Sequence, residues 1–89
     1  MTGQNKITQV ILQTAYERGV SKSTCPSEIA RELFPGNWRK HMGEIRDAAI
    51  SLHKSGEVLL MQKGRIIDPD DFKGPIRIRI GPLLKPEND

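Results

Sequence analysis

The fold is decided by residues 26–54, which read PSEIARELFPGNWRKHMGEIRDAAISLHK. This stretch holds two helical patterns separated by Phe34-Pro35-Gly36-Asn37, where proline disfavours helix at the residue before it. Pro26 suits the first position of a helix, with Cys25 as the preceding cap and Glu28 placed as in a capping box. The buried side of this helix is predicted to consist of Ile29, Ala30 and Leu33.

The second pattern predicts a longer helix from Trp38 to about Lys54, capped by Asn37 and closed by Gly56. Its apolar residues recur with the 3.6-residue period of an amphipathic helix, which fixes one face as core. That face comprises Trp38, Met42, Ile45, Ala49 and Leu52, so Trp38 is expected in the core.

The flanking segments complete the expected fold. Residues 4–18 predict an amphipathic helix that stops at Gly19, followed by a turn or short strand over residues 21–24. Residues 57–62 and 65–68 predict a hairpin around a tight Lys63-Gly64 turn. Residues 76–80 alternate strictly as a strand, and the prolines that bracket it, Pro75 and Pro82, favour an edge position.

The order of these elements predicts an α+β fold, a winged helix. It has a three-helix helix-turn-helix core, then a β-hairpin wing and a further C-terminal strand. We expect a single winged-helix-like domain over residues 1–89, ordered over about 4–82, with a polar tail at 83–89.

Composition excludes several classes of protein. The chain has 89 residues, with 14 Lys and Arg against 11 Asp and Glu, so its net charge of +3 permits nucleic-acid contact without requiring it. One cysteine, Cys25, excludes an intrachain disulfide, and two histidines are too few for a zinc site. No apolar run approaches the roughly 20 residues of a membrane helix. We therefore expect a cytoplasmic protein with no membrane segment, metal or cofactor.

Several motifs also resemble a known family. They are the run from Cys25 to Arg31, Trp38-Arg39 with Met42, Arg46, Ala49 and Leu52, then Lys63-Gly64, Asp68-Pro69 and the run from Lys73 to Arg77. Over about residues 7–82 the chain resembles the bacterial domain of unknown function 3253 family. The resemblance implies a winged-helix-like fold and a bacterial, cytoplasmic protein, and it implies no activity.

The start of the long helix is one candidate surface for nucleic acid. In helix-turn-helix proteins the second helix of the motif enters the major groove and its N-terminal residues contact bases. Here that helix opens with Asn37, Arg39 and Lys40, and Arg46 follows along one shoulder. Alternatively, Arg39 pairs with a glutamate of the preceding helix, Glu28 or Glu32. Acidic residues on the outer face of the helix, Glu44 and Asp47, weaken the case for reading of base sequence.

The hairpin and last strand form a second candidate surface. Lys63 and Arg65 lie at the predicted tip, and Arg77 and Arg79 project from one face of the strand. Such cations would fix position on a phosphate backbone without reading sequence. Charged residues also protect edge strands from aggregation, and Arg77 could pair with an aspartate of residues 68–71, so both interpretations stay open.

Catalysis is not expected. Cys25 with a histidine is the only nucleophilic pairing, and a buried, inert cysteine is the simpler interpretation. We predict a small nucleic-acid-binding domain that contacts duplex DNA mainly through phosphates. The alternative is a non-catalytic protein–protein interaction module on the same scaffold. The predicted nucleic-acid-binding residues are Asn37, Arg39, Lys40, Arg46, Lys63, Arg65, Arg77 and Arg79.

Overall fold

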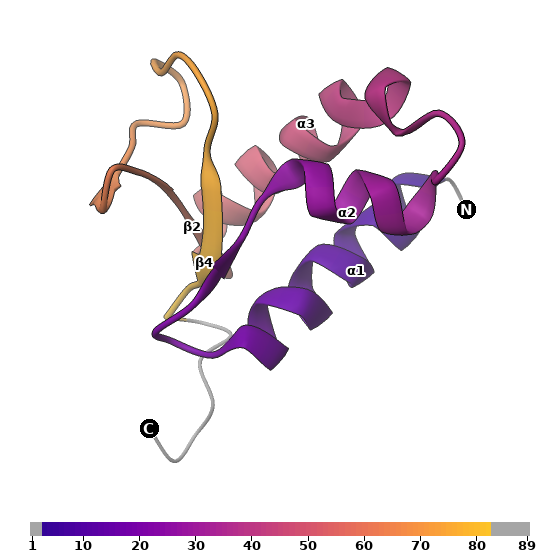
Figure 1. Ribbon diagram of the computed structural model, residues 1–89. Helices are drawn as coiled ribbons and strands as arrows, with labels where there is room; N and C mark the ends of the chain where they lie inside the picture. The colour runs from indigo at the N-terminus through magenta and orange to yellow at the C-terminus, as the bar shows by residue number, and fades with distance from the viewer. Residues whose placement is uncertain (1–2, 83–89) are drawn as a thin grey trace.

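The computed structural model of the protein describes residues 3–82, and the polar tail predicted at 83–89 lies outside the described residues. Helices and strands follow the expected order (Figure 1). The elements are α1 (Gly3–Arg18), β1 (Ser23–Thr24), α2 (Pro26–Leu33), the 3-10 helix η1 (Trp38–His41), α3 (Met42–Lys54), β2 (Val58–Gln62), β3 (Arg65–Ile66) and β4 (Arg77–Ile80). The α+β class is confirmed, and the arrangement is compatible with a winged helix.

The four strands form one antiparallel sheet in the order β1-β4-β2-β3. The predicted edge position of the last strand is therefore wrong, because β4 lies between β1 and β2. The short strand β1 covers what would have been its free edge, with Ser23 opposite Arg79 and Thr24 opposite Ile78. Pro75 and Pro82 lie just outside β4 and so leave its backbone hydrogen bonds intact.

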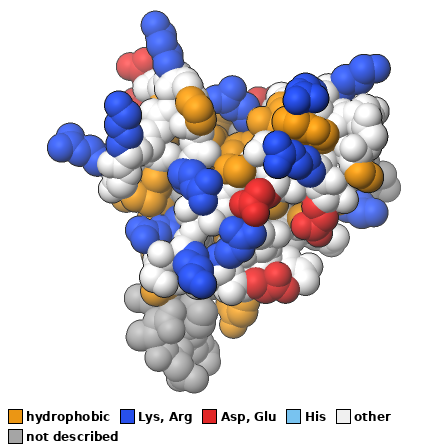
Figure 2. Space-filling model, in the orientation of Figure 1, with side chains coloured by type: hydrophobic (Ala, Val, Ile, Leu, Met, Phe, Trp, Pro, Cys, Tyr) orange, Lys and Arg blue, Asp and Glu red, His pale blue; other side chains and the backbone are white. Residues whose placement is uncertain are grey.

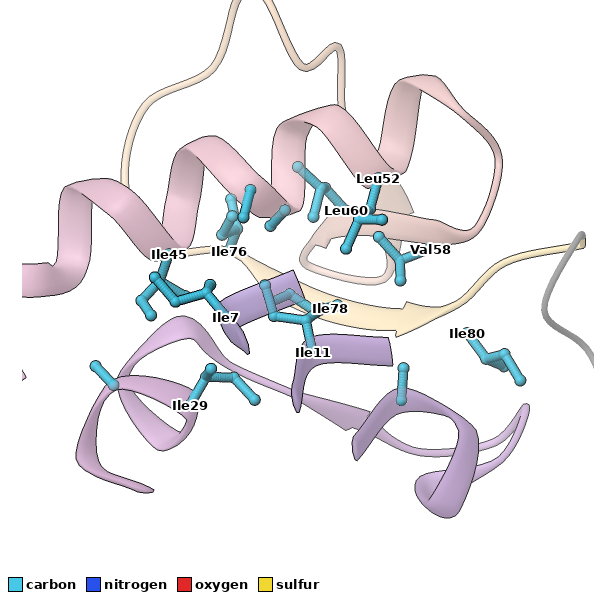
Figure 3. Close-up of a cluster of buried hydrophobic side chains, with 14 residues drawn as sticks. Ile7, Ile11, Ile29, Ile45, Leu52, Val58, Leu60, Ile76, Ile78 and Ile80 are labelled. Carbon is cyan, nitrogen blue, oxygen red and sulfur yellow. The ribbon is translucent and has the colours of Figure 1, made fainter. Parts of the chain in front are cut away.

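The core lies between the helices and one face of this sheet. Alternate strand residues Val58, Leu60, Ile78 and Ile80 are buried, and α1 packs against β4 while α3 packs against β2. Isoleucines from α1, α2 and α3 meet them in a single cluster (Figure 3). Because side chains alternate along a strand, the residues between these positions face the opposite side of the sheet.

The tight turn of the hairpin is confirmed. Lys63 and Gly64 both have positive φ, 52° and 78°, as a two-residue type I′ turn requires. The second strand is shorter than predicted, since β3 ends at Ile66. The chain still follows β2 for one more residue, where the Ile67 N–H donates to the Leu60 carbonyl at 3.0 Å.

The beginning of the long helix differs from the prediction. Its first turn is the 3-10 helix η1, and α3 starts only at Met42. Asn37 holds the predicted cap position, with φ −149° and ψ 38°, but its side chain makes no capping hydrogen bond. The first turn has the tighter 3-10 form, in which i→i+3 bonds such as that from the Lys40 N–H to the Asn37 carbonyl, at 3.1 Å, satisfy terminal groups. Trp38 is only partly buried and packs at the margin of the core rather than within it.

Candidate nucleic-acid interface

The outer face of the sheet, which the helices leave uncovered, carries two rows of side chains. The register places Leu59 beside Arg79, and Met61 beside both Arg77 and Ile66. These residues alternate with the buried set of β2 and β4. The sequence prediction that Arg77 and Arg79 share one face is confirmed by this register.

Both arginines of β4 are positioned by neutral groups. Arg77 donates from Nε to the Ser23 Oγ at 2.9 Å and from Nη2 to the Ser23 carbonyl at 3.3 Å. Arg79 points its Nη1 to the Met61 Sδ at 3.9 Å. Neither forms an ion pair among residues 3–82, so Arg77 does not pair with residues 68–71. Their charges therefore remain available to an anion.

Further cations join them around two clefts. A cleft of 870 Å³ at the hairpin is lined by Lys63, Arg65, Lys73 and Arg77 together with uncharged residues. A second cleft of 260 Å³, beside β1, is lined by Lys22, Arg77 and Arg79. Among the described residues, no carboxylate lines either cleft. We call the six cations the cationic face: Lys22, Lys63, Arg65, Lys73, Arg77 and Arg79.

Figure 2 shows one face of the molecule, with Lys and Arg side chains over the left of the view, where the hairpin lies, and others at the upper right. Most acidic side chains in this view lie at the centre and lower right, and one lies at the upper left. Sequence reasoning found four of the cations and missed Lys22 and Lys73. Lys22 precedes a strand of two residues, and Lys73 lies in a loop, so neither position carried a periodic signal.

The loop after the hairpin is held so that Lys73 joins this surface. The Gln62 amide donates to the carbonyls of Lys73 at 2.6 Å and Pro75 at 2.9 Å. Two of the loop's acidic side chains have partners within the fold. Asp70 forms an ion pair with Lys54 at 2.8 Å, and Asp68 accepts the Asp70 backbone N–H at 2.9 Å.

The three site residues predicted at the start of the long helix lie away from the cationic face. Asn37, Arg39 and Lys40 line a separate cleft of 470 Å³ formed by residues 35–40. In Figure 1 this turn lies at the right of the molecule, whereas the hairpin and β4 lie at the left. The guanidinium groups of Arg31 and Arg39 lie 4.6 and 4.5 Å from the centroid of Trp38. Arg39 thus stacks on Trp38 instead of pairing with Glu28 or Glu32.

Arg46, the predicted shoulder residue, is engaged by the loop that leads into β4. Its Nη2 donates to the Gly74 carbonyl at 2.9 Å, and its guanidinium lies 5.5 Å from the centroid of Phe72. The outer side of α3 presents Glu44 and Asp47, both exposed, and Glu44 contacts the ring of His41. These acidic residues would repel phosphates along the helix that a winged helix uses for base recognition.

A further ion pair joins α1 to the start of α2. Arg18 donates to both carboxylate oxygens of Glu28, at 2.9 and 3.3 Å, and Thr24 donates to the same carboxylate at 2.7 Å. These hydrogen bonds, that of Arg18 first, lower the pKa of Glu28 from 4.5 to about 2. Cys25 holds the cap position of α2 without a capping bond and is partly exposed, so the prediction of a buried cysteine is wrong.

Residues 3–82 contain no group of three or more His, Cys, Asp or Glu side chains that could hold a metal ion. In the same residues, no helix has both the length and the apolar character needed to cross a membrane.

Comparison with known proteins identifies a family. A family model described as "Protein of unknown function (DUF3253)" matches residues 4–81. None of the curated proteins matches the chain.

Proposed function

The chain belongs to the DUF3253 family, and we propose that it binds duplex DNA through its cationic face, mainly by phosphate contacts and without catalysis. The observation that carries the proposal is the grouping of six Lys and Arg residues around two adjoining clefts that no carboxylate of the described residues lines. Neutralising DNA phosphates releases condensed counterions, which supplies most of the affinity of non-specific binding.

The same geometry favours phosphate contacts over base recognition. On α3, Arg46 is engaged by Gly74, and Glu44 and Asp47 occupy the exposed side. Cations on the hairpin and β4 would instead lie along the backbone, where contacts fix position without reading sequence. No aromatic residue of the described part of the chain lines the two clefts, so single-stranded bases have no stacking platform among residues 3–82 there.

The first test is a salt titration of duplex binding by fluorescence anisotropy. If all six cations neutralise phosphates, the slope of log K against log salt is about −5. Duplexes of unrelated sequence should bind with similar affinity. Absence of binding at low salt, or an affinity that salt leaves unchanged, would reject the proposal.

Two triple variants with equal loss of charge locate the surface. Lys63→Gln, Arg65→Gln and Lys73→Gln together remove three cations of the cationic face, and the slope should become shallower by about 3. Arg31→Gln, Arg39→Gln and Lys40→Gln together remove three cations around Trp38 and η1, a region that we call the helical end. The slope of this variant should stay near that of the parent. Equal effects of the two triple variants would show that only total charge matters and that the assigned face is wrong.

One observation supports the alternative of a protein partner. Ile66 is 59% exposed and lies opposite Met61 on the outer face of the sheet, next to Arg65 of the cationic face. A protein partner for this surface would be acidic with an apolar contact. Ile66→Ser discriminates the two functions, because duplex binding should not change while binding of such a protein should weaken.

A further inference from the structure

A pocket separate from the two clefts lies between the helices and the sheet. It has a volume of 540 Å³ and is lined by residues 25–27, by Met42 and Arg46 of α3, and by residues 74–77. Ligand pockets for small molecules have volumes of about 300–1,000 Å³. Figure 2 shows hydrophobic side chains in this region of the surface, with Lys or Arg side chains beside them.

The lining is mostly apolar. Pro26 and Ile76 are buried and Met42 is partly buried, so the hydrocarbon part of a ligand in this pocket would lie against apolar side chains. Among the described residues, Arg46 and Arg77 are the only charged residues of the lining. A ligand complementary to these walls has an apolar body and a negative group.

Both guanidinium groups are fixed before any ligand arrives. Arg46 is held by the Gly74 carbonyl and the ring of Phe72, and Arg77 is held by the Oγ and carbonyl of Ser23. A guanidinium has five N–H donors, so each arginine retains donors for a second acceptor. Prior ordering of these side chains reduces the entropy that a bound anion would otherwise cost.

From this geometry we infer that the pocket between α2, α3 and residues 74–77 binds a small amphipathic organic carboxylate. Its carboxylate lies against Arg46 and Arg77, and its hydrocarbon part lies against Pro26, Met42 and Ile76. A bare inorganic anion would leave the apolar walls in water, and a neutral hydrocarbon would offer no acceptor to the N–H donors that Gly74 and Ser23 leave free. The inference does not rest on DNA binding, and the pocket shares Arg77 with the two clefts.

The probe is octanoate, and 1-octanol and inorganic phosphate serve as controls for the negative group and the hydrocarbon. Backbone amide shifts should change at residues 25–27, 42, 46 and 74–77 when octanoate is added. Octanoate should bind about tenfold more tightly than 1-octanol, because hydrogen bonds between charged partners are the stronger ones. Cys25 is the only cysteine and lines the pocket, so octanoate should also slow its alkylation by iodoacetamide.

Variants separate recognition of the anion from general damage. Arg46→Gln should bring octanoate and 1-octanol to nearly equal affinity, and Arg77→Gln should reduce their ratio in the same way. Arg39→Gln lies outside the pocket and should preserve both the ratio and the protection of Cys25. A thermal melt of each variant identifies any that fails to fold, and the remaining arginine variant then carries the test.

Three outcomes would overturn the inference. They are no amide shifts at millimolar octanoate, shifts scattered over the surface, or equal affinity of the parent for octanoate and 1-octanol. Each can occur whether or not the protein binds duplex DNA, so failure here is distinct from failure of the proposed function.

Discussion

The helical layer and the outer face of the sheet both carry cations, but the cations have different partners. Among residues 3–82, the two ion pairs that involve Lys or Arg both have their cation on a helix, namely Arg18 and Lys54. On the sheet, Arg77 and Arg79 contact a hydroxyl, a carbonyl and a sulfur atom, none of which carries a charge. A positive field therefore depends on what the cations touch more than on how many there are.

This comparison predicts that changes within the fold alter stability, whereas changes on the cationic face alter binding. The largest stability effect is expected at Gly81, where the end of β4 meets the turn before β2. A Cβ at this position would lie 2.5 Å from the Gly56 carbonyl oxygen and 2.8 Å from the Val58 nitrogen, both backbone atoms. Gly81→Ala should lower the free energy of unfolding by about 3 kcal/mol, measured by urea denaturation.

Gly43 is the matched control for Gly81. It lies near the start of α3, and a Cβ there has no neighbour within 4 Å. Gly43→Ala should raise the stability by about 0.5–1 kcal/mol, because alanine is the better helix former. If the two alanine variants have similar stability, close packing between β4 and the turn at residues 56–58 is not what holds the sheet in place.

The next effect is expected at His53, which links α3 to the sheet. The buried Leu60 donates its backbone N–H to the His53 Nδ1 at 2.9 Å. His53→Ala leaves that N–H without a partner and should lower the free energy of unfolding by about 2 kcal/mol. Duplex binding at a temperature where the variant is folded should match that of the parent.

The other histidine is the control. His41 stacks on Phe34, with 3.6 Å between the ring centroids, and contacts the exposed Glu44. Because this contact is near the surface, His41→Ala should lower the stability by only about 0.5–1 kcal/mol. If His41→Ala lowers the free energy of unfolding more than His53→Ala does, the hydrogen bond from Leu60 to His53 is not what joins α3 to the sheet.

Much of the fold follows from local sequence signals. The stops at Gly19 and Gly56 and the turn at Lys63-Gly64 match residues with positive φ, a conformation in which glycine has no Cβ penalty. The position of β4 could not be predicted in this way. Its neighbour on one side is β1, a strand of two residues that begins 54 positions earlier in the chain. A strand this short has no recognisable sequence pattern, and nothing local links it to a partner so far away.

The candidate site was predictable only in part, for a similar reason. The alternation at residues 76–80 placed Arg77 and Arg79 on one face. Arg46 and Trp38 follow the period of the helix equally well. Arg46 is nevertheless engaged by Gly74, 28 positions further along the chain, and Trp38 is only partly buried, with the guanidinium group of Arg31 lying 4.6 Å from its ring centroid. Lys73 joins the cationic face because Gln62 holds its loop, which only the folded chain shows.

A smaller effect concerns acid stability of the helical layer. The pKa of Glu28 is about 2 in the folded protein and ordinarily 4.5. The ionised carboxylate therefore adds its full contribution to the free energy of unfolding above pH 4.5, and this contribution is lost as the pH falls toward 2. Since about two fifths of its side chain is exposed, we expect this contribution to be only about 1 kcal/mol. Glu28→Gln should therefore flatten the fall in stability over this pH range, measured by urea denaturation at each pH.

Glu32 provides the control on the same helix. It is exposed and forms no ion pair among the described residues, so Glu32→Gln should preserve the parent's pH dependence. Duplex binding at neutral pH should be alike in both variants if the helical layer is separate from the interface. A pH dependence that survives Glu28→Gln would mean that another carboxylate governs acid unfolding.

The smallest expected effect is a spectroscopic one at Trp38, the only tryptophan. Two guanidinium groups lie within 4.6 Å of its ring centroid, at the end of the molecule away from the hairpin, so duplex bound to the cationic face does not touch it. Its emission should stay constant through a duplex titration that saturates the anisotropy signal, whereas urea should shift it as the ring enters water. Quenching on binding, abolished by Lys40→Gln, would place DNA on the helical end. It would mean that the charges of Arg31 and Arg39 remain available to phosphate even while their guanidinium groups stack on the ring.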